Sequence, residues 1–227
     1  MNKKNLLHDG ERLDDLQYKN LFIIQHPKKY CFTSDAVMLA NFVKGGSKDK
    51  MVDLCSGSGV IGILASQKQN IKSTVLVELQ EYLADMSNRS IEYNQLQDKI
   101  IVVNRKLQGV SKEIGEGKFS IVVCNPPYKL SGSILNENSE IAICRHEIAV
   151  TLEDIIKETS KLLKYGGKFY TVNKEERLVD IACLCRKYGM EVKKIEIIPS
   201  EKGANVVMVE ALKGGKSGVK IDITPRI

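Results

Sequence analysis

The sequence lacks long hydrophobic runs, internal repeats and low-complexity tracts. No apolar stretch approaches the roughly 18 residues that a membrane-spanning helix needs, so we expect no membrane association. The first fifteen residues carry positive charge but no apolar core, so we expect no secretory signal. With 43% hydrophobic and 27% charged residues, the composition is that of an ordinary globular protein. We therefore expect a cytoplasmic protein.

Cysteine is present, but its pattern excludes two common uses. The six cysteines lie mostly in apolar stretches, at positions 31, 55, 124, 144, 183 and 185. Their spacing fits neither a zinc site nor the disulfide framework of a small secreted protein. We interpret them as buried, reduced thiols and expect no metal site.

Charge is unevenly distributed along the chain. The net charge is +6, and residues 1–156 carry 19 basic and 19 acidic side chains. Residues 157–227 carry 15 basic against 9 acidic side chains and so account for the whole excess. A basic C-terminal third suits a polyanion such as nucleic acid, although a solvated lysine-rich surface explains it as well.

Short β-branched runs alternate with helical patterns through the centre of the chain. The expected strands are residues 51–55, 73–78, 100–104, 119–124 and 167–172. The expected helices between them are residues 60–69, 80–96 and 151–167. Thr151 is the expected N-cap of the last helix, with Asp154 completing a near capping box. This alternation predicts an α/β fold with right-handed crossovers and a buried parallel sheet.

The end of the chain departs from that alternation. Residues 190–199 and 205–212 are typical of strands, and only a short loop separates them. A loop of that length joins antiparallel neighbours, so the sheet is expected to finish with a hairpin.

The start of the chain is predicted to form a cap. Residues 14–32 indicate a short hairpin or meander, and residues 34–43 indicate a helix with Ser34 or Asp35 at its N-cap. No linker separates this part from the rest. We therefore expect one structural unit, with an N-terminal cap over residues 1–45 and the main domain over residues 46–227.

A glycine turn follows the first expected parallel strand. The strand carries Asp53 near its end, and Gly57 and Gly59 then permit positive φ and close approach of a ligand to the backbone. The second strand ends in Glu78, a carboxylate placed to bind two ribose hydroxyls. With Gly62 the turn also matches the dinucleotide-binding fingerprint. The terminal hairpin and the motif described next argue against a hydride-transfer enzyme.

The fourth expected strand runs directly into the sequence NPPY, residues 125–128. Pro126 and Pro127 have no backbone N–H, so the strand must stop, and Asn125 is held in an extended conformation. The result is a rigid strand end that presents an amide and the ring of Tyr128. Such an end is either a simple strand terminator or a reaction site.

These features together resemble a class I S-adenosylmethionine-dependent methyltransferase. The glycine turn, Glu78, the NPPY sequence and the hairpin ending follow that family's Rossmann-like pattern, a mostly parallel seven-stranded sheet whose last strand is antiparallel. Within it, the chain is most similar to the bacterial valine-tRNA adenine N6-methyltransferases. The segments that carry this likeness are ERLDDL (11–16), FTSDAVMLA (32–40), VDLCSGSG (52–59), EYNQLQ (92–97), CNPPY (124–128), RHEIAVTLED (145–154), LLKYGGK (162–168) and KGAN (202–205).

The resemblance implies a cofactor, a substrate and a set of site residues. The implied cofactor is S-adenosyl-L-methionine, with S-adenosyl-L-homocysteine as product. The implied catalytic residues are Asn125, Pro126, Pro127 and Tyr128. The implied cofactor-binding residues are Phe32, Thr33, Asp35, Asp53, Cys55, Gly57, Gly59, Glu78, Leu79, Asn104 and Asn125. The implied RNA contacts are Tyr128, Arg145 and His146.

The implied partner is RNA, in particular an adenine in the anticodon loop of tRNA, with no obligatory protein partner. A structural helix cap explains Ser34 and Asp35 equally well, and a surface ion pair explains Arg145 and His146. Two other functions remain open. The same fold methylates rRNA, DNA or a protein glutamine, and a relative without activity would only bind RNA.

The chain departs from the family pattern at three places. The tip of the third strand usually carries an acid that binds the cofactor's adenine amine, and here it carries Asn104, Arg105 and Lys106. Two cations near a cationic cofactor are expected to weaken binding. Ser120 replaces an aspartate before NPPY, and residues 173–174 are Asn-Lys where the family tends to have His-Arg.

Overall fold

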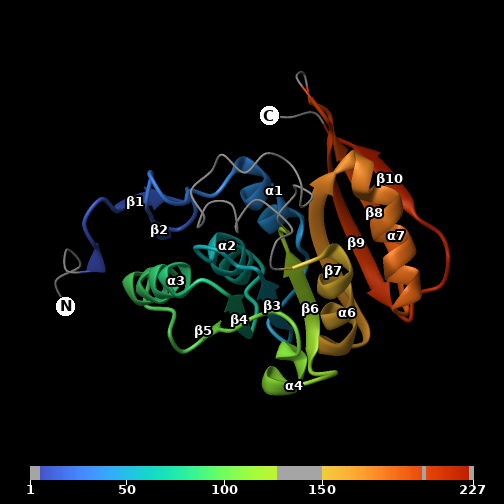
Figure 1. Cartoon of the computed structure of the whole chain (residues 1–227), viewed down its shortest axis with the longest axis horizontal. Helices are drawn as coiled ribbons and strands as arrows, with labels where there is room; N and C mark the ends of the chain where they lie inside the picture. The colour runs from blue at the N-terminus through green and yellow to red at the C-terminus, as the bar shows by residue number, and fades with distance from the viewer. Residues whose placement is uncertain (1–5, 127–149, 201–202, 225–227) are drawn as a thin grey trace.

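The computed structural model describes residues 6–126, 150–200 and 203–224, and an eight-stranded sheet organises them (Figure 1). The strands lie in the order β10-β8-β9-β7-β6-β3-β4-β5. All neighbours are parallel except the two pairs that β9 makes, with β7 and with β8. The strands are β3 (Lys50–Leu54), β4 (Ser73–Glu78), β5 (Ile100–Asn104), β6 (Phe119–Cys124), β7 (Leu163–Lys174), β8 (Met190–Ile198), β9 (Val206–Lys213) and β10 (Lys220–Ile223).

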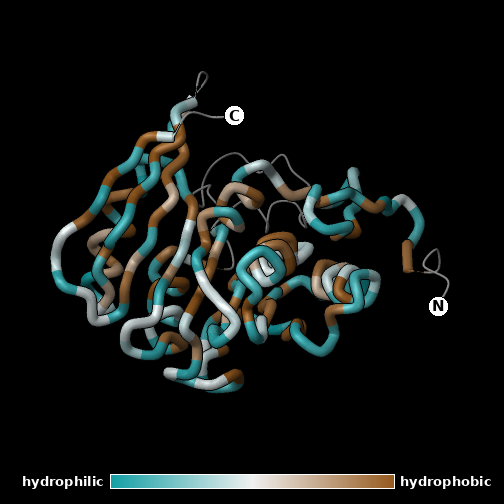
Figure 2. Tube along the Cα trace, turned by 180° about the vertical axis from the view of Figure 1, so that it is seen from behind, coloured by the Kyte–Doolittle hydropathy of each residue, from teal (hydrophilic) through white to brown (hydrophobic). Residues whose placement is uncertain are grey.

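The predicted α/β sheet with a terminal hairpin is confirmed. All seven expected strands are present, and β6 is buried at every position, as expected for a mostly apolar strand that helices cover on both faces. Hydrophobic and hydrophilic residues alternate along β8 instead, because this strand lies toward the edge of the sheet (Figure 2). The eighth strand, β10, was not expected. Its four residues alternate lysine, isoleucine and aspartate, which is too short a pattern to indicate a strand.

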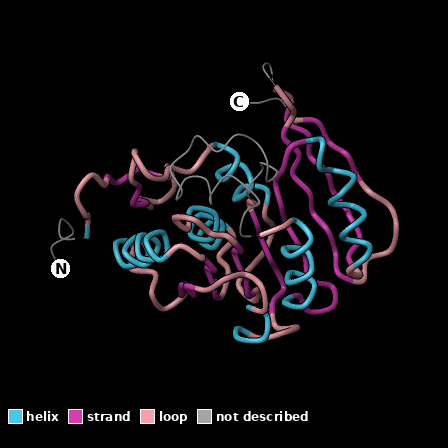
Figure 3. The backbone as a smooth tube through the Cα atoms, in the orientation of Figure 1, coloured by secondary structure: helices cyan, strands magenta, loops and turns pink. Residues whose placement is uncertain are grey.

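Helices cover both faces of the sheet (Figure 3). In β7, the consecutive residues Phe169 and Tyr170 point to opposite faces and are both fully buried, Tyr170 with α1 and α2, Phe169 with α6 and α7. Burial of each such side chain contributes about 1.5–3 kcal/mol to stability. The helices are α1 (Ser34–Phe42), α2 (Val60–Lys68), α3 (Glu81–Tyr93), α4 (Val110–Ile114), α6 (Leu152–Leu162) and α7 (Leu178–Lys187), with the short 3₁₀ helix η2 (Glu175–Arg177).

The helix boundaries show where local sequence signals hold. The expected capping box of α6 is present: Thr151 Oγ1 accepts the Asp154 N–H at 3.1 Å, and Asp154 Oδ2 accepts the Thr151 N–H at 3.2 Å. The helix ends at Leu162 rather than at Gly167, because Leu163 already pairs with β6. The N-cap of α1 is Thr33, one residue before the expected Ser34 or Asp35.

The N-terminal segment forms the expected hairpin, β1 (Arg12–Asp15) and β2 (Phe22–Gln25), paired antiparallel. Two side chains bind β2: Ser90 on α3, and Asn94 at the C-cap of that helix. Asn94 Oδ1 accepts the Phe22 N–H at 3.0 Å, and Ser90 Oγ accepts the Ile24 N–H at 3.0 Å. The hairpin is thus fixed to α3, whereas the division of the chain at residue 45 stays a prediction.

Arg89 on α3 fastens the segment before the hairpin. Its guanidinium donates to the carbonyl of Leu6 at 2.6 Å, to Glu11 Oε1 at 2.8 Å and to Asp85 Oδ2 at 2.9 Å. The Glu11 side chain is fully buried and that of Arg89 is 10% exposed. Loss of the guanidinium leaves a buried carboxylate without its partner, which is strongly unfavourable.

We therefore expect Arg89→Ala to lower the free energy of unfolding by about 2–3 kcal/mol. The matched control is Arg186→Ala, because Arg186 makes a similar two-pronged contact with Glu191 while 67% of its side chain is exposed. The control should cost less than about 1 kcal/mol. Urea unfolding of the two variants measures the difference, and equal losses would contradict a special role for Arg89.

Candidate active site

The sheet register brings the predicted site residues of four strands to one edge. Leu54 at the end of β3 is paired with Cys124 at the end of β6, so Cys55 and Asn125 leave neighbouring strands together. Glu78 at the end of β4 is paired with Asn104 at the end of β5. In open α/β sheets this carboxyl edge is where ligands bind.

The glycine turn between β3 and α2 is tightly enclosed. Gly57 and Gly59 have φ of 57° and 84°, values that favour glycine. A Cβ at Gly57 would lie 2.5 Å from the hydroxyl oxygen of Tyr30, so the Tyr30 ring packs directly against the turn. Cys55, the first residue after β3, also has a positive φ of 56°. No local sequence pattern indicates that Tyr30, near the end of the cap, lies on this turn.

Asp53 lies beneath the turn rather than at its surface. Its side chain is fully buried, and Oδ2 accepts the Gly62 N–H at 2.8 Å, which holds the first turn of α2 on the strand. A Cβ at Gly62 would lie 2.2 Å from Leu76, so glycine is needed for this close packing. Among the described residues, Oδ1 of Asp53 has no hydrogen-bond partner. The observed hydrogen bond of Asp53 positions α2 on β3. A contact between Asp53 and the cofactor stays a prediction.

Burial raises the pKa of Asp53 to about 8 from an ordinary value of 3.8; the Gly62 hydrogen bond opposes this shift and the charge of Glu78 adds to it. The folded-state pKa is therefore above the unfolded one. Stability contributed by protonated Asp53 is fully present below about pH 4 and is lost as the pH rises through about 8.

We expect Asp53→Asn to flatten this pH dependence. Between about pH 5 and about pH 8.5, the wild type should lose about 1 kcal/mol or more of unfolding free energy relative to the variant. The side chain of asparagine has the same shape but does not titrate, so the difference isolates this carboxyl. Urea unfolding at the two pH values measures it, and parallel pH curves would contradict the assignment.

Glu78 joins the second strand to the glycine turn. Its Oε2 accepts the Gly57 N–H at 2.8 Å and its Oε1 accepts the Gln80 N–H at 2.9 Å. The side chain is buried at 6% exposure, and burial raises its pKa, although these backbone hydrogen bonds oppose the shift. The carboxylate thus points at the turn from the strand end.

Two side chains lie next to Glu78: the apolar Leu79 and the amide of Asn104. Leu79, the residue after Glu78, is 43% exposed. Asn104 Nδ2 donates to the carbonyls of Glu78 and Leu79, at 2.9 and 3.0 Å. This leaves Oδ1 of Asn104 as an acceptor in the position where the family carries an acid. Arg105 is paired with Glu113 at 3.5 Å, which offsets part of the positive charge at this tip.

The predicted residues of the cap lie at the start of α1. Thr33 is the exposed N-cap, and Asp35 is buried in the first turn at 8% exposure. The Phe32 N–H donates to Gln25 Oε1 at 2.7 Å, which connects the segment to β2. Helix α1 packs on α2, so these residues belong to the layer that carries the glycine turn. Their contact with the methionine part of a cofactor stays a prediction.

The reaction motif is described in part. Asn125 is half-buried and Pro126 is buried at the end of β6. Pro127, Tyr128, Arg145 and His146 lie outside the described residues.

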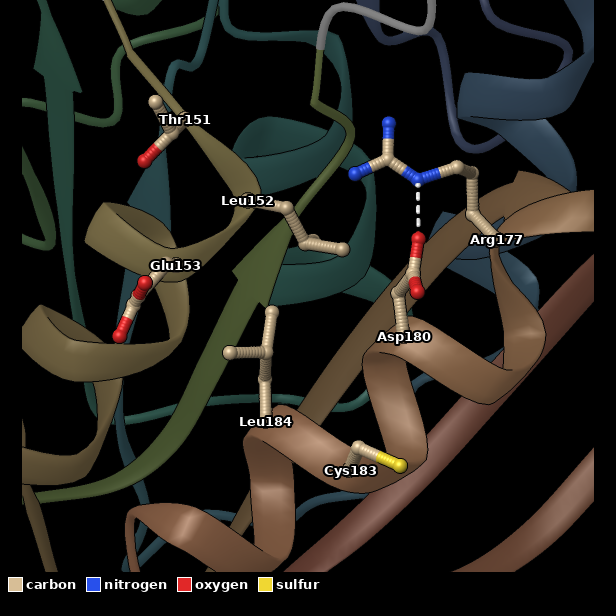
Figure 4. Close-up of a pocket in the computed structure, with 7 residues that line it drawn as sticks. All are labelled: Thr151, Leu152, Glu153, Arg177, Asp180, Cys183 and Leu184. Atoms are coloured by element: carbon tan, nitrogen blue, oxygen red, sulfur yellow. Dashed lines mark hydrogen bonds and ion pairs between the residues drawn. The ribbon is translucent and has the colours of Figure 1, made fainter.

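A hollow of about 400 Å³ lies between the N-terminal turns of α6 and α7 (Figure 4). Arg177 Nε donates to Asp180 Oδ2 at 3.0 Å, and Glu153 is paired with Lys187. Because the charges of this hollow are matched within the protein, it offers no net positive surface to a phosphate. Its lining residues are Thr151, Leu152, Glu153, Arg177, Asp180, Cys183 and Leu184.

Comparison with known families identifies this arrangement. The family profile described as methyltransferase small domain matches residues 32–193, from the cap into the first residues of β8. The chain belongs to the methyltransferase small domain family. The matched range contains the glycine turn, Glu78, Asn104 and Asn125, so the expectation of a methyltransferase is confirmed at the level of family and fold.

Individual relatives are similar to this methyltransferase-family chain at low identity. A tRNA1(Val) (adenine(37)-N6)-methyltransferase of Shewanella woodyi is 24% identical over 153 residues, which are 66% of this chain and 62% of the relative. The protein of that name from Porphyromonas gingivalis is 23% identical over 148 residues, which are 64% and 58% of the two chains. The chain thus matches less than two thirds of the length of these curated relatives.

Solved structures share the fold. A crystal structure of M. jannaschii TYW2 in complex with AdoMet has a TM-score of 0.64 at 12% identity, over 91% of this chain and 88% of that one. A methyltransferase from Pyrococcus furiosus has a TM-score of 0.63 at 23% identity, over 87% and 91%. At these identities the likeness shows the methyltransferase fold alone.

The residues present fit S-adenosylmethionine. The hydroxyls of Ser56 and Ser58 in the glycine turn are buried without a partner among the described residues, so a bound ligand would satisfy them. Glu78 offers carboxylate oxygens for ribose hydroxyls, Leu79 offers an exposed apolar face for the adenine, and Asn104 Oδ1 offers an acceptor for its amine. In the described part of this methyltransferase, no helix has the length and hydropathy to cross a membrane.

Proposed function

We propose that this chain transfers a methyl group from S-adenosylmethionine to N6 of an adenine in RNA, with the anticodon loop of valine tRNA as the first candidate. One observation carries the proposal. The pairing of Leu54 with Cys124 brings Asn125 beside the glycine turn, so an amine bound at Asn125 is close to a cofactor bound at that turn. The names of the Shewanella and Porphyromonas relatives support adenine N6 and tRNA.

The cofactor supplies an electrophilic methyl group on a sulfonium. Glu78 holds the ribose hydroxyls, while Leu79 and Asn104 hold the adenine end. The Asn125 carbonyl oxygen and the Pro126 backbone carbonyl each accept one N–H of the target amine. These two bonds draw the amine toward sp³ character and aim its lone pair at the methyl group, and positioning of this kind supplies most of the acceleration.

The target base must leave its stack to reach Asn125, which favours a loop base or a flipped base. Tyr128 is proposed to stack on that base, a contact worth roughly 1–3 kcal/mol in single-strand recognition. Arg145 and His146 are proposed to contact the RNA that arrives beside it. No strong general base is required, because the amine loses its proton after the transfer.

The basic C-terminal third contributes less to RNA binding than its composition suggests. Among the described residues of this third, seven basic side chains form ion pairs within the chain. Lys193 and Lys213 donate to backbone carbonyls. Lys28 and Lys29 are exposed and directly precede Tyr30, whose ring packs against the glycine turn. These two lysines are therefore better placed to contact phosphates near the site.

Calorimetric titration with S-adenosylmethionine and S-adenosylhomocysteine, without and with tRNA present, tests the cofactor. Transfer of a labelled methyl group to an unmodified valine tRNA transcript then tests the reaction. The control is the same transcript with guanine in place of its anticodon-loop adenines. Micromolar cofactor binding and adenine-dependent labelling are expected.

Two other experimental outcomes would each indicate a different function. Labelling of ribosomal RNA, DNA or a protein glutamine in place of tRNA would keep the fold's chemistry and change its target. RNA binding without cofactor binding, even when tRNA is present, would indicate a relative that has lost the reaction.

A further inference from the structure

The outer edge of the sheet carries an exposed apolar strand. In the described part of the chain, β10 pairs with β8 on one side and has no neighbour on the other (Figure 1). Val219, Ile221 and Ile223 are 49%, 56% and 70% exposed. Because side chains alternate along a strand, these three share one face, and Lys220 and Asp222 occupy the opposite face.

The backbone of this edge is arranged to accept another strand. The Thr224 N–H donates to the carbonyl of Ile197 in β8 at 2.9 Å. Hydrogen-bonding direction alternates from one residue to the next along a strand, so residues 220, 222 and 224 bond toward β8. The N–H and C=O groups of residues 219, 221 and 223 therefore point outward, and an edge of this kind is a template for strand addition.

We propose that β10 pairs antiparallel with β10 of a second copy of this chain, about a two-fold axis through Ile221. Symmetric antiparallel pairing that uses the outward groups has three nearby registers, centred on residue 220, 221 or 222. Centring on Lys220 places two lysines opposite each other, and centring on Asp222 does the same with two aspartates. Like charges directly opposite destabilise a pair, so Ile221 is the favoured centre.

The register centred on Ile221 is complementary at every position. Lys220 lies opposite Asp222 of the partner subunit, and the two-fold axis repeats this pair. Val219 lies opposite Ile223 of the partner subunit, and Ile221 meets Ile221 of the partner subunit. The three outward-bonding residues form hydrogen-bonded pairs with their opposites. One isologous contact thus covers the exposed apolar side chains of both copies.

The same features argue against other occupants. Lys220 and Asp222 cancel in charge and are already ion-paired at 3.1 Å, so the strand presents no positive surface to RNA. Within one copy, Lys194 also contacts Asp222 at 3.5 Å, so these charges keep complementary neighbours in the dimer. The self-complementary order of five residues is a property that a second copy uses in full and an unrelated strand does not.

The dimer joins two eight-stranded sheets into one continuous sheet. Because the two β10 strands run antiparallel, the carboxyl edges of the two sheets face opposite directions. Each copy keeps its own candidate active site, away from the contact. The proposed dimer is therefore independent of the reaction, and its loss is expected to leave methyl transfer by each copy intact.

Sedimentation equilibrium of the full chain tests the proposal. We expect the mass to rise from 25.4 kDa toward twice that value with a midpoint below about 100 µM, as suits a small interface. Ile221→Arg places two cations on the axis and should shift the midpoint upward by tenfold or more. The matched control is Ile101→Arg, since Ile101 is also 56% exposed but lies on β5, the opposite edge of the sheet.

A charge exchange tests the register separately. Lys220→Asp and Asp222→Lys each place like charges opposite each other and should weaken the dimer, whereas the double variant restores unlike pairs and should restore it. A wild type that stays at 25.4 kDa up to about 100 µM would overturn the proposal. A dimer that survives Ile221→Arg, or that Ile101→Arg dissociates instead, or a double variant no better than the single ones, would overturn it as well.

Discussion

Asn125→Ala is expected to lower the rate of methyl transfer by about 10³-fold while changing the affinity for S-adenosylmethionine by less than about 3-fold. Asn125 lies at the end of β6, and its neighbour Cys124 is paired with Leu54 beside the glycine turn. The proposed role of its carbonyl oxygen is to orient the target amine, an interaction that strengthens as the amine becomes tetrahedral. Single-turnover transfer to tRNA and calorimetry with the cofactor measure the two effects separately.

Two variants control this experiment. Asn125→Asp keeps an acceptor oxygen at the same place and should retain more activity than alanine. Asn41→Ala removes an exposed amide whose oxygen accepts a hydrogen bond from Lys68 Nζ, so it should behave like the wild type. If Asn125→Ala were fully active, NPPY would be a strand terminator, and the proposed chemistry would have to be placed elsewhere. A large loss of cofactor affinity would instead indicate that Asn125 supports the glycine turn.

The central strands could be predicted because each contains a short run of mostly apolar residues between two helical patterns. A parallel strand covered by helices on both faces must be hydrophobic at consecutive positions, as β6 is. The capping box of α6 could be predicted for a similar reason, since Thr151 and Asp154 are three residues apart and interact within one turn. Structural features that depend on a few neighbouring residues can therefore be predicted from the sequence.

Contacts between distant segments could not be predicted. Tyr30 lies against Gly57 because α3 holds the N-terminal hairpin over the turn, and no spacing encodes that contact. Asn104 binds the carbonyl of Glu78, which is 26 residues away in the sequence. Asn104, which stands where the family usually has an acid, therefore also has a structural role. Its amide hydrogens hold the ends of β4 and β5 together.

The number of basic residues also does not show which of them form ion pairs with distant acidic residues. The basic excess of the C-terminal third is visible in the sequence, but its pairing is not. Arg186 binds Glu191, and Lys187 binds Glu153 on another helix. A count of lysines therefore overstates the charge that an RNA would meet, and it does not distinguish the smaller exposed pair of Lys28 and Lys29.

Glu78→Ala is expected to weaken binding of S-adenosylmethionine by about 10²-fold or more, because a buried carboxylate that binds hydroxyls gives strong hydrogen bonds. The substitution has a second effect, since Glu78 Oε2 also accepts the Gly57 N–H. Glu78→Gln keeps the side-chain shape and one acceptor oxygen, so it should lose less affinity than alanine. Calorimetric titration of the wild type and both variants measures the order.

A ribose contact and a purely structural role make different predictions for a cofactor analogue. S-adenosylhomocysteine without ribose 2′ and 3′ hydroxyls should bind the wild type far more weakly than the intact product does. In Glu78→Ala the two compounds should bind almost equally, because the partner of the hydroxyls is already gone. Equal discrimination by wild type and variant would remove the ribose role and leave Glu78 as the residue that ties the glycine turn to β4.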